Sequence, residues 1–576
     1  EFMRLMKEKR FLKEYENIVW SFILVLVLSI VVAIRYDYYY ALNDDVLIKD
    51  IISGVYTGTP ESRNNQMLYP LTLLFALLYR MIPVVPWYGV FLWLCHYGCL
   101  FLVLHRILKL CEDKKVKRLI CLPVCFVLGA VFLEHLVLVQ YTVTGGLLAT
   151  TALFLLVTET DREHLFRNSM PYIGLAVLSL LIRSEMLLLM LPFLCVAGLY
   201  VWSCEKKIFE RVHFYKYFGI IGCLLVCVGI MLLADNLAYS GKEWKEFRSF
   251  FDARTTLYDY TGVPLYEQNE AFYATKEINL QQYALLENYN YGLDSRIDAT
   301  MMEEVAQYAE GIQDGFFQRL KMGMVRYRYR ITNMDGYPYC LWAVAGYLLL
   351  LLSVCQKNKW RIMFTGGMML MVRSVIWVYI LMTNRIPDRI IHPLYFAECF
   401  LLAAIFCVEM SGKERKQRIY RVVPAIAILL VITIINLGNS IRNTETEIAR
   451  IEDNNIANRH FRQYCSEHQE DFFLLDVYSS IFFTEKVFTK QQPGENHELL
   501  GGWICNSPLY KKKLEAYGIT SVEEALLNQD NVFLVQEADK SLDWVEAYYE
   551  SKGYRISIAE KNRIDGGLAI YSLENK

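Results

Sequence analysis

The sequence has almost no net charge and lacks the short motifs that mark common soluble enzymes. Its 59 Lys and Arg residues balance 61 Asp and Glu residues, whereas nucleic-acid-binding proteins have a clear excess of basic residues. It contains no GxSxG, P-loop, GxGxxG or HExxH motif. The chain is therefore predicted to bind no nucleic acid, and the sequence shows no place for nucleotide chemistry.

Metal-binding patterns are also missing. The fifteen cysteines include no CxxC pair with histidine partners, which is the usual signature of a zinc site. Most of them lie inside apolar blocks, where a thiol behaves as a small hydrophobic side chain. Cys465 and Cys505 lie in the more polar C-terminal part, and the sequence leaves open whether they form a disulfide.

Long apolar blocks are what the chain does contain. Hydrophobic residues make up 55% of the sequence, and they gather in blocks of roughly 20 residues, enough to cross about 30 Å of hydrocarbon. The pattern predicts an α-helical polytopic membrane protein with about eleven transmembrane helices. The predicted spans are residues 18–34, 87–108, 118–135, 144–157, 171–183, 186–203, 217–235, 339–355, 361–382, 390–410 and 422–438.

Basic residues indicate the orientation. The N-terminal segment is basic, and so are the loops at 114–118, 206–211, 357–361 and 413–418, which places all of them on the cytoplasmic side. The alternate loops contain few basic residues. This pattern requires that residues 67–82 lie along the membrane surface, because a crossing there would move every later basic loop outside.

Two domains follow from this layout. Residues 1–438 are predicted to form the transmembrane domain, with a first outer loop at 35–86 and a large outer loop at 236–338. Residues 439–576 are predicted to form a soluble extracytoplasmic α/β domain. The strand-like runs FFLLDV, NVFLVQ and GLAIYSL alternate there with the helical runs PLYKKKLEAYG and SLDWVEAYYESKG.

The most informative short stretch is YALNDDVLIKD, which places Asp44 and Asp45 just beyond the first span. A carboxylate at the hydrocarbon boundary is partly desolvated, which raises its pKa and suits it to general-base work or metal binding. The alternative is helix capping, since Asn43 and the two aspartates open a helical run. The two roles are compatible, because a cap also fixes the orientation of a carboxylate.

Several charged side chains are candidates for binding a lipid phosphate, because the arginine fork holds two oxygens at once. They are Arg183, Glu185, Arg254, Arg373, Arg385, Arg389 and His392. Arg373 is predicted near the middle of the span 361–382, and the others outside the apolar core or near the outer surface. We predict that Arg183, Arg373 and Arg385 approach one cavity that opens to the outer leaflet. The alternatives are an ion pair between Arg183 and Glu185, and a partner within the bundle for Arg373.

Tyrosines in the stretch DARTTLYDYTGVPLY of the large outer loop form a further group. Tyrosine is common at membrane interfaces for its mixed polarity alone. Tyr258, Tyr260 and Tyr266 are equally suited to stacking on a sugar ring.

This layout resembles the GT-C superfamily of membrane glycosyltransferases. The matching residues are Asn43-Asp44-Asp45, which follow the first span in a long outer loop with two interfacial helices. Members of that superfamily share an inside N-terminus, an acidic pair in this loop, many spans and often a soluble outer domain. The stretches RIPDRIIHPLYF and LGGWICNSPLY also look like segments of polytopic proteins of Gram-positive bacteria.

The resemblance implies transfer of a sugar, with inversion, from a polyprenyl-phosphate-linked donor. The acceptor would be a glycan, lipid or protein at the outer face of the bacterial cytoplasmic membrane, among membrane lipids. Asp44 would be the base, and Asp45 its helper or the ligand of a divalent metal such as Mg²⁺ or Mn²⁺. The WWD-type motif of oligosaccharyltransferases is missing, which argues against an enzyme that reads sequons.

Three other classes remain open. A polysaccharide polymerase or ligase would use arginine-rich outer loops without an aspartate pair. A transporter or flippase of a lipid-linked glycan would need charged sites at the bilayer midplane, for which Arg373 is the only candidate. A non-catalytic scaffold would use the aspartates for capping alone.

Overall fold

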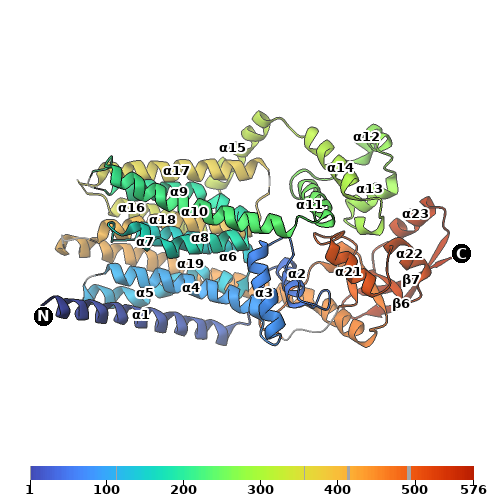
Figure 1. Ribbon diagram of the computed structural model, residues 1–576, viewed down its shortest axis with the longest axis horizontal. Helices are drawn as coiled ribbons and strands as arrows, with labels where there is room; N and C mark the ends of the chain where they lie inside the picture. Colours follow the sequence, from blue (N-terminus) through green and yellow to red (C-terminus); the bar gives the residue numbers. More distant parts are fainter. Residues whose placement is uncertain are drawn as a thin grey trace.

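The computed structural model describes residues 2–111, 113–205, 207–355, 357–383, 385–411, 415–489 and 495–576. Lys206 and Lys413, two basic residues of the predicted inner loops, lie outside these ranges. Helices run lengthwise in one bundle, and a sheet domain containing the C-terminus lies beyond one end of it (Figure 1). We call this the sheet end; the N-terminus lies at the opposite end.

Within the described residues, nine helical segments are long and apolar enough to cross a membrane. They are formed by α1 (Phe2–Arg35), α4 (Trp87–Leu110), α5 (Lys114–Val137), α7 with α8 (Leu165–Asn168 and Met170–Ile182), α9 (Ser184–Ser203), α10 (Arg211–Ala238), α17 (Lys359–Met382), α18 (Asp388–Met410) and α19 (Arg415–Glu467). The remaining two predicted spans correspond to the shorter apolar helices α6 (Tyr141–Val157) and α16 (Tyr339–Leu352). The polytopic α-helical class is confirmed, while the count of eleven crossings stays a prediction.

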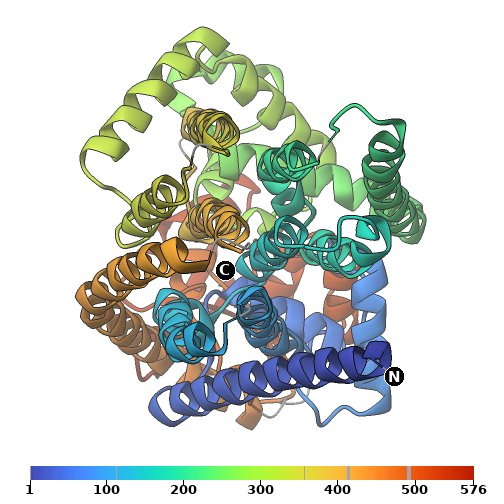
Figure 2. The same cartoon turned by 90° about the vertical axis from the view of Figure 1, so that its left-hand side faces the viewer.

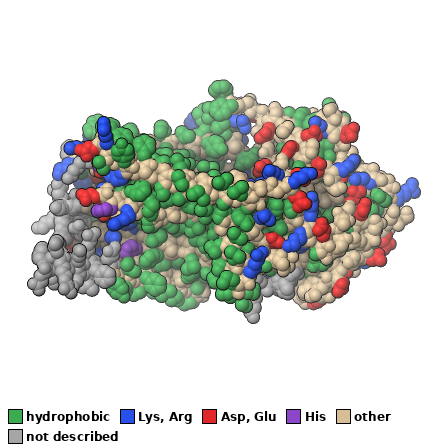
Figure 3. Space-filling model, in the orientation of Figure 1, with side chains coloured by type: hydrophobic (Ala, Val, Ile, Leu, Met, Phe, Trp, Pro, Cys, Tyr) green, Lys and Arg blue, Asp and Glu red, His purple; other side chains and the backbone are tan. Residues whose placement is uncertain are grey.

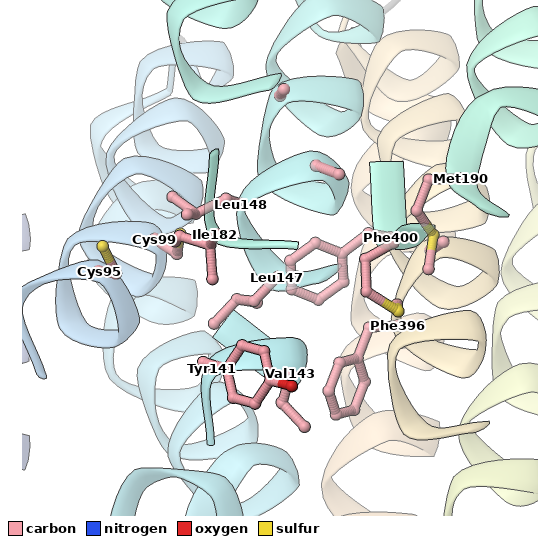
Figure 4. Close-up of a cluster of buried hydrophobic side chains, with 14 of the residues drawn as sticks. Cys95, Cys99, Tyr141, Val143, Leu147, Leu148, Ile182, Met190, Phe396 and Phe400 are labelled. Carbon is pink, nitrogen blue, oxygen red and sulfur yellow. The ribbon is translucent and has the colours of Figure 1, made fainter. Parts of the chain in front are cut away.

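The helices differ sharply in how much of their surface is covered. All residues of α6 except Leu156 are buried, and its side chains pack against those of α18, such as Phe396 and Phe400 (Figure 4). In contrast, α10 lies at the edge of the bundle (Figure 2), and only Tyr217 and Asp235 are buried along it. Hydrophobic side chains cover the middle of the bundle, whereas charged ones gather toward its ends (Figure 3). This distribution is expected of a bundle whose outer helices face lipid.

The loop after α1 forms a small platform at the sheet end. The strand β1 (Tyr39–Tyr40) pairs in parallel with β2 (Leu138–Val139), which ties this loop to the end of α5. Two helices follow, α2 (Asn43–Ser53) and α3 (Tyr69–Met81), and α3 runs across the bundle end rather than along it (Figure 1). Gly54 ends α2 with a φ of 90°, a conformation that favours glycine.

The large loop between α10 and α16 folds into short helices. They are α11 (Lys242–Thr255), the π-helix η1 (Thr256–Thr261), η2 (Tyr266–Gln268), α12 (Glu270–Thr275), α13 (Leu280–Glu287), η3 (Tyr291–Leu293), α14 (Ala299–Gly311) and α15 (Phe316–Thr332). This loop shares a hydrophobic core with the sheet domain, in which Tyr291 packs with Leu500 and Cys505. The two soluble parts therefore hold each other in place.

The C-terminal part contains a five-stranded sheet in the order β4-β3-β5-β7-β6. Its elements are β3 (Phe472–Leu475), α20 (Val477–Ser480), β4 (His497–Leu499), α21 (Pro508–Ala516), α22 (Val522–Asn528), β5 (Val532–Glu537), α23 (Asp543–Ser551), β6 (Ile556–Ile564) and β7 (Leu568–Asn575). The first three strands in that order are parallel, and β7 is antiparallel to both its neighbours. The predicted α/β class is confirmed, and the five runs singled out in the sequence form β3, β5, β7, α21 and α23.

Two details differ from the sequence-based picture. The helix α19 does not end with its span at residue 438 but continues to Glu467. Cys465 and Cys505 are both buried free thiols, and they belong to two different hydrophobic clusters, so they form no disulfide.

Candidate functional site

The aspartate pair stands at the start of α2, held between the bundle and the sheet domain. The backbone N–H of Ala41 donates to Val139 O at 2.8 Å, and that of Tyr40 donates to Glu485 O at 2.9 Å. The N-cap residue Leu42 makes no side-chain hydrogen bond to the helix. The predicted capping role is therefore not observed as a hydrogen bond, although two carboxylates in the first turn still suit the helix dipole.

Asp45 points into the protein and is completely buried. Its Oδ1 accepts hydrogen bonds from the Tyr88 hydroxyl at 2.7 Å and from the Tyr141 backbone N–H at 3.1 Å. Its Oδ2 is buried with no hydrogen-bond partner. Asp45 thus ties α2 to α4 and α6, and it cannot contact a substrate directly.

Burial also changes the protonation of Asp45. Desolvation raises its pKa to about 8, and the hydrogen bond from Tyr88 lowers it only in part. Near neutral pH this carboxyl group is therefore mostly uncharged. The two adjacent aspartates have different electrostatic roles, because the neutral Asp45 does not compete with Asp44 for cations.

Asp44 faces the opposite way, toward an arginine of α18. Its Oδ2 lies 3.2 Å from Arg389 Nη1, and both side chains are about one-quarter exposed, at 23% and 28%. Arg389 lies in the segment RIPDRIIHPLYF, in the first turn of the bundle helix α18. The first outer loop and α18, 345 positions apart in the chain, thus meet in one ion pair.

Arg183 is a second arginine whose surroundings include Asp44. Its Nη1 donates to Gln66 Oε1 at 2.8 Å, and its Nε lies 3.1 Å from Glu185 Oε2. The predicted ion pair with Glu185 is thus present. Although burial lowers the pKa of the Arg183 guanidinium, its neighbours, Asp44 among them, raise it above its usual value. Asp44 thus belongs to the electrostatic surroundings of Arg183, after Tyr141 and Glu185.

Two more arginines involve the large loop. Arg385 Nη1 lies 3.0 Å from Asp259 Oδ2 in η1, and its guanidinium lies 5.3 Å from the centre of the Tyr260 ring. Arg254, at the end of α11, donates to the Tyr289 hydroxyl and has a buried Nε without a partner. Asp259 lies in the π-helix η1, which directly follows α11, and π-helical turns often occur at functional sites.

We call Asp44, Arg183, Glu185, Arg254, Asp259, Arg385 and Arg389 the Asp44 cluster. The cluster contains four arginines and three carboxylates. The adjacent Asp45 adds little negative charge, because burial raises its pKa to about 8. An excess of guanidinium groups beside a carboxylate is suited to a phosphate-bearing ligand.

A cavity of about 360 Å³ opens beside this cluster. Asp44, Arg254, Asp259 and Tyr289 line one part of it, and the loop around Trp503 from the sheet domain lines another. Its size lies in the usual range for small-molecule sites. The first loop, the large loop and the C-terminal part of the chain all contribute to its wall.

The site does not fit a divalent metal. A cation on Asp44 would lie against the Arg389 guanidinium, and Asp45 is buried with one oxygen already hydrogen-bonded. Within the described ranges, no group of three His, Cys, Asp or Glu side chains is arranged to hold a metal ion. The metal-ligand role predicted for Asp45 is therefore not supported by its surroundings.

Of the residues predicted to bind phosphate, only Arg254 lines the cavity, and two of the others, Arg373 and His392, lie outside the Asp44 cluster as well. Arg373 is ion-paired with Glu398 of α18 inside the bundle, where the Tyr347 hydroxyl also donates to Glu398 at 2.9 Å. None of Arg183, Arg373 and Arg385 lines this cavity, so their predicted approach to it is not observed. The charge of Arg373 is already compensated by the buried carboxylate of Glu398. His392 lies one turn after Arg389 but faces His135, with its Nδ1 2.9 Å from His135 Nε2.

Of the three tyrosines singled out in the large loop, two lie near the cavity or the Asp44 cluster and one does not. Tyr258 lines the cavity, and Tyr260 stacks near Arg385, whereas Tyr266 packs on Tyr273 within the loop. Sequence reasoning missed Asp259, although it lies in the stretch already singled out for its tyrosines. Gln66 and Tyr289 have no local signal, since only tertiary contacts bring them to the cluster.

Comparisons with known proteins give little further detail. No protein-family model and no curated protein matches the sequence. Among solved structures, the chain is similar to ArnT from Cupriavidus metallidurans, in the apo state and bound to undecaprenyl phosphate. The TM-scores are 0.39 and 0.38 at 10% identity, over 96% of this chain and 97% of ArnT. At this level the likeness says nothing about activity, which has to be inferred from the site itself.

Proposed function

We propose that this protein is a membrane glycosyltransferase that moves a sugar from a polyprenyl-phosphate donor to an acceptor at the outer membrane face. The observation that carries the proposal is the Asp44 cluster: an accessible carboxylate with Arg389, beside a cavity at the end of a transmembrane bundle. A lipid-linked donor presents its sugar at that depth, because its chain stays in the hydrocarbon and its phosphate lies at the interface.

Asp44 is the general base of the proposed reaction. It accepts the proton of the acceptor hydroxyl while the hydroxyl oxygen forms the new bond to the anomeric carbon. The bond from the anomeric carbon to the phosphate oxygen breaks, and its electron pair leaves with the lipid phosphate. Attack opposite the leaving group inverts the configuration of the sugar.

The arginines serve the leaving group. Arg389 has N–H donors beyond the one that faces Asp44, so it can contact a phosphate and the base together. Arg254 lines the same cavity, and Arg183 and Arg385 add positive charge within the Asp44 cluster beside it. Charge that develops on the phosphate oxygen is stabilised by such preorganised donors.

The structure weighs against the transport alternative. A transporter needs a charged site at the bilayer midplane that a substrate can reach. Arg373, the only candidate, is paired with the buried carboxylate of Glu398. The charge of Arg373 is thus already compensated within the bundle, whereas Asp44 stands beside a cavity that a substrate can enter.

The test compares two aspartates of the same loop. Asp44→Asn keeps the side-chain size and removes the base, so sugar transfer by isolated membranes is expected to fall by about 10²–10⁴-fold. Asp37→Asn is the control, because Asp37 is 64% exposed and pairs with Lys486 outside the cavity. The transferred sugar is identified by mass spectrometry as the one missing from envelope glycans of a deletion strain. Unchanged transfer by Asp44→Asn would exclude the mechanism.

A further inference from the structure

We propose that the part of the cavity next to the sheet domain is the acceptor site, and that the acceptor is a neutral carbohydrate. This inference builds on the proposed function, because it assigns a ligand to the part of the same cavity that the sheet domain lines. We call this part the acceptor pocket; it is lined by Tyr478, Glu495, His497, Glu498, Trp503 and Lys513.

The acceptor pocket has buried polar atoms that lack hydrogen-bond partners. His497 Nδ1 and Arg462 Nε have none, and Glu498 Oε2 has none besides its ion pair with Lys513 Nζ at 3.2 Å. Buried polar groups are normally hydrogen-bonded, because leaving one unpaired is costly. Here donors and acceptors stand side by side, and a sugar hydroxyl, which both donates and accepts, satisfies either kind.

The charges of the acceptor pocket are internally compensated. Arg462 lies 2.6 Å from Glu485 and 3.1 Å from Glu495, and Lys513 pairs with Glu498. Burial lowers the pKa of His497 to about 3, so its imidazole is neutral at physiological pH. In contrast to the arginine-rich Asp44 cluster, this end has no excess of positive charge for a phosphate.

Aromatic side chains complete the walls. Tyr478 is 43% exposed, and Trp503 lies in the segment LGGWICNSPLY. That segment lies very close to the large loop, since a Cβ on Gly501 would be only 1.9 Å from Tyr289 O. Flat aromatic faces with a few fixed polar groups are typical of small-molecule pockets, and they match the flat, hydroxyl-bearing surface of a sugar ring.

The two ends of the cavity thus differ in the way a transfer reaction requires. The arginines stand around Asp44, where the lipid phosphate of the donor arrives. The compensated, aromatic end is lined by residues of the sheet domain, and that domain lies beyond the end of the bundle (Figure 1). A carbohydrate held there presents a hydroxyl group toward Asp44.

The experiment measures binding by saturation-transfer NMR with the full-length protein in detergent. The probes are soluble oligosaccharides hydrolysed from bacterial cell walls, with a mixture of Ser-, Thr- and Asn-containing peptides as the competing class. Wild type is expected to bind saccharides, and Tyr478→Ala to bind them about three- to tenfold more weakly, as expected for the loss of one aromatic contact. His497→Phe, which fills the pocket, should abolish binding.

The matched control is Tyr554→Ala, a tyrosine of the same domain that is 38% exposed and packs on Tyr549. No saccharide binding by wild type, equal loss in Tyr478→Ala and Tyr554→Ala, or preferential binding of peptides would overturn the inference. Asp44→Asn separates it from the proposed function, since that variant should lose transfer and keep saccharide binding. Dependence of saccharide binding on Tyr478 together with full transfer by Asp44→Asn would refute only the proposed mechanism.

Discussion

Two arginine–carboxylate pairs join distant segments of this protein, and they differ in what surrounds them. Asp44 and Arg389 are each about one-quarter exposed and stand beside a cavity. Arg373 and Glu398 lie inside the bundle, and Glu398 is 1% exposed and also bonded to Tyr347. The first pair has capacity left for a ligand, whereas the second is closed on itself.

The comparison shows that depth in the membrane is a poor guide to function. An arginine at membrane depth suggests a functional site because it is costly there. Glu398 offsets that cost for Arg373, so no ligand is needed to explain it. Arg389 is paired with Asp44, but this pair is partly exposed and Arg389 has further N–H donors for a ligand.

Breaking the buried ion pair of Arg373 and Glu398 should have the largest effect on stability. Glu398→Gln leaves the Arg373 guanidinium buried without a counter-charge, which is expected to lower the free energy of unfolding by about 3–5 kcal/mol. The measurement is unfolding in detergent, followed by tryptophan fluorescence. The double variant Arg373→Met, Glu398→Met removes both charges and should recover most of the stability and of the transfer activity. Loss of transfer in a stable double variant would give the pair a functional role.

Breaking the partly exposed ion pair of Asp44 and Arg389 should affect activity instead. Arg389→Gln removes a charge-assisted contact worth about 1.5–3 kcal/mol to a bound phosphate, so transfer should fall by about 10–100-fold, mainly through a higher KM for the donor. Stability should change little, because exposed pairs contribute little. Arg389→Lys keeps the charge but loses the fork, so an intermediate value is expected. An unchanged donor KM in Arg389→Gln would remove Arg389 from the phosphate site.

Asp45, the buried neighbour of Asp44 in the sequence, should affect the pH dependence of stability. The folded-state pKa of Asp45 is about 8, above its value in the unfolded chain, so the folded state holds an extra proton between these two values. The contribution of Asp45 to stability is therefore fully present at low pH and is lost as pH rises toward 8. Asp45→Asn does not titrate, so its melting temperature should decline less between pH 5 and pH 8. Parallel profiles would show that Asp45 is charged throughout.

The smallest effect on function is expected from a test of orientation. Cys465 and Cys505 are too buried to report it, so two exposed lysines, Lys561 of β6 and Lys207 at the opposite end, are replaced by cysteine. An impermeant thiol reagent should label Lys561→Cys in intact cells and Lys207→Cys only after lysis, because the basic loops are predicted to be inside. The reverse labelling would place the cavity in the cytoplasm and remove it from lipid-linked donors of the outer leaflet.

The fold was largely accessible from the sequence because its signals are local. Each predicted span lies in an apolar helix, since about 20 consecutive apolar residues suffice to identify one. The first loop forms α2 and α3 as expected. The strands β4 and β6 were not predicted, because β4 has only three residues and β6 is mostly polar and exposed.

The amino-acid sequence by itself determined where the long apolar helices are and that two carboxylates follow the first of them. Only the tertiary structure decided that Asp44 faces a cavity while Asp45 is buried, and that Arg373 is paired with Glu398. The reason is physical. Apolar periodicity acts over a few turns of one helix, whereas burial, protonation and ion pairing depend on neighbours that can be hundreds of positions away.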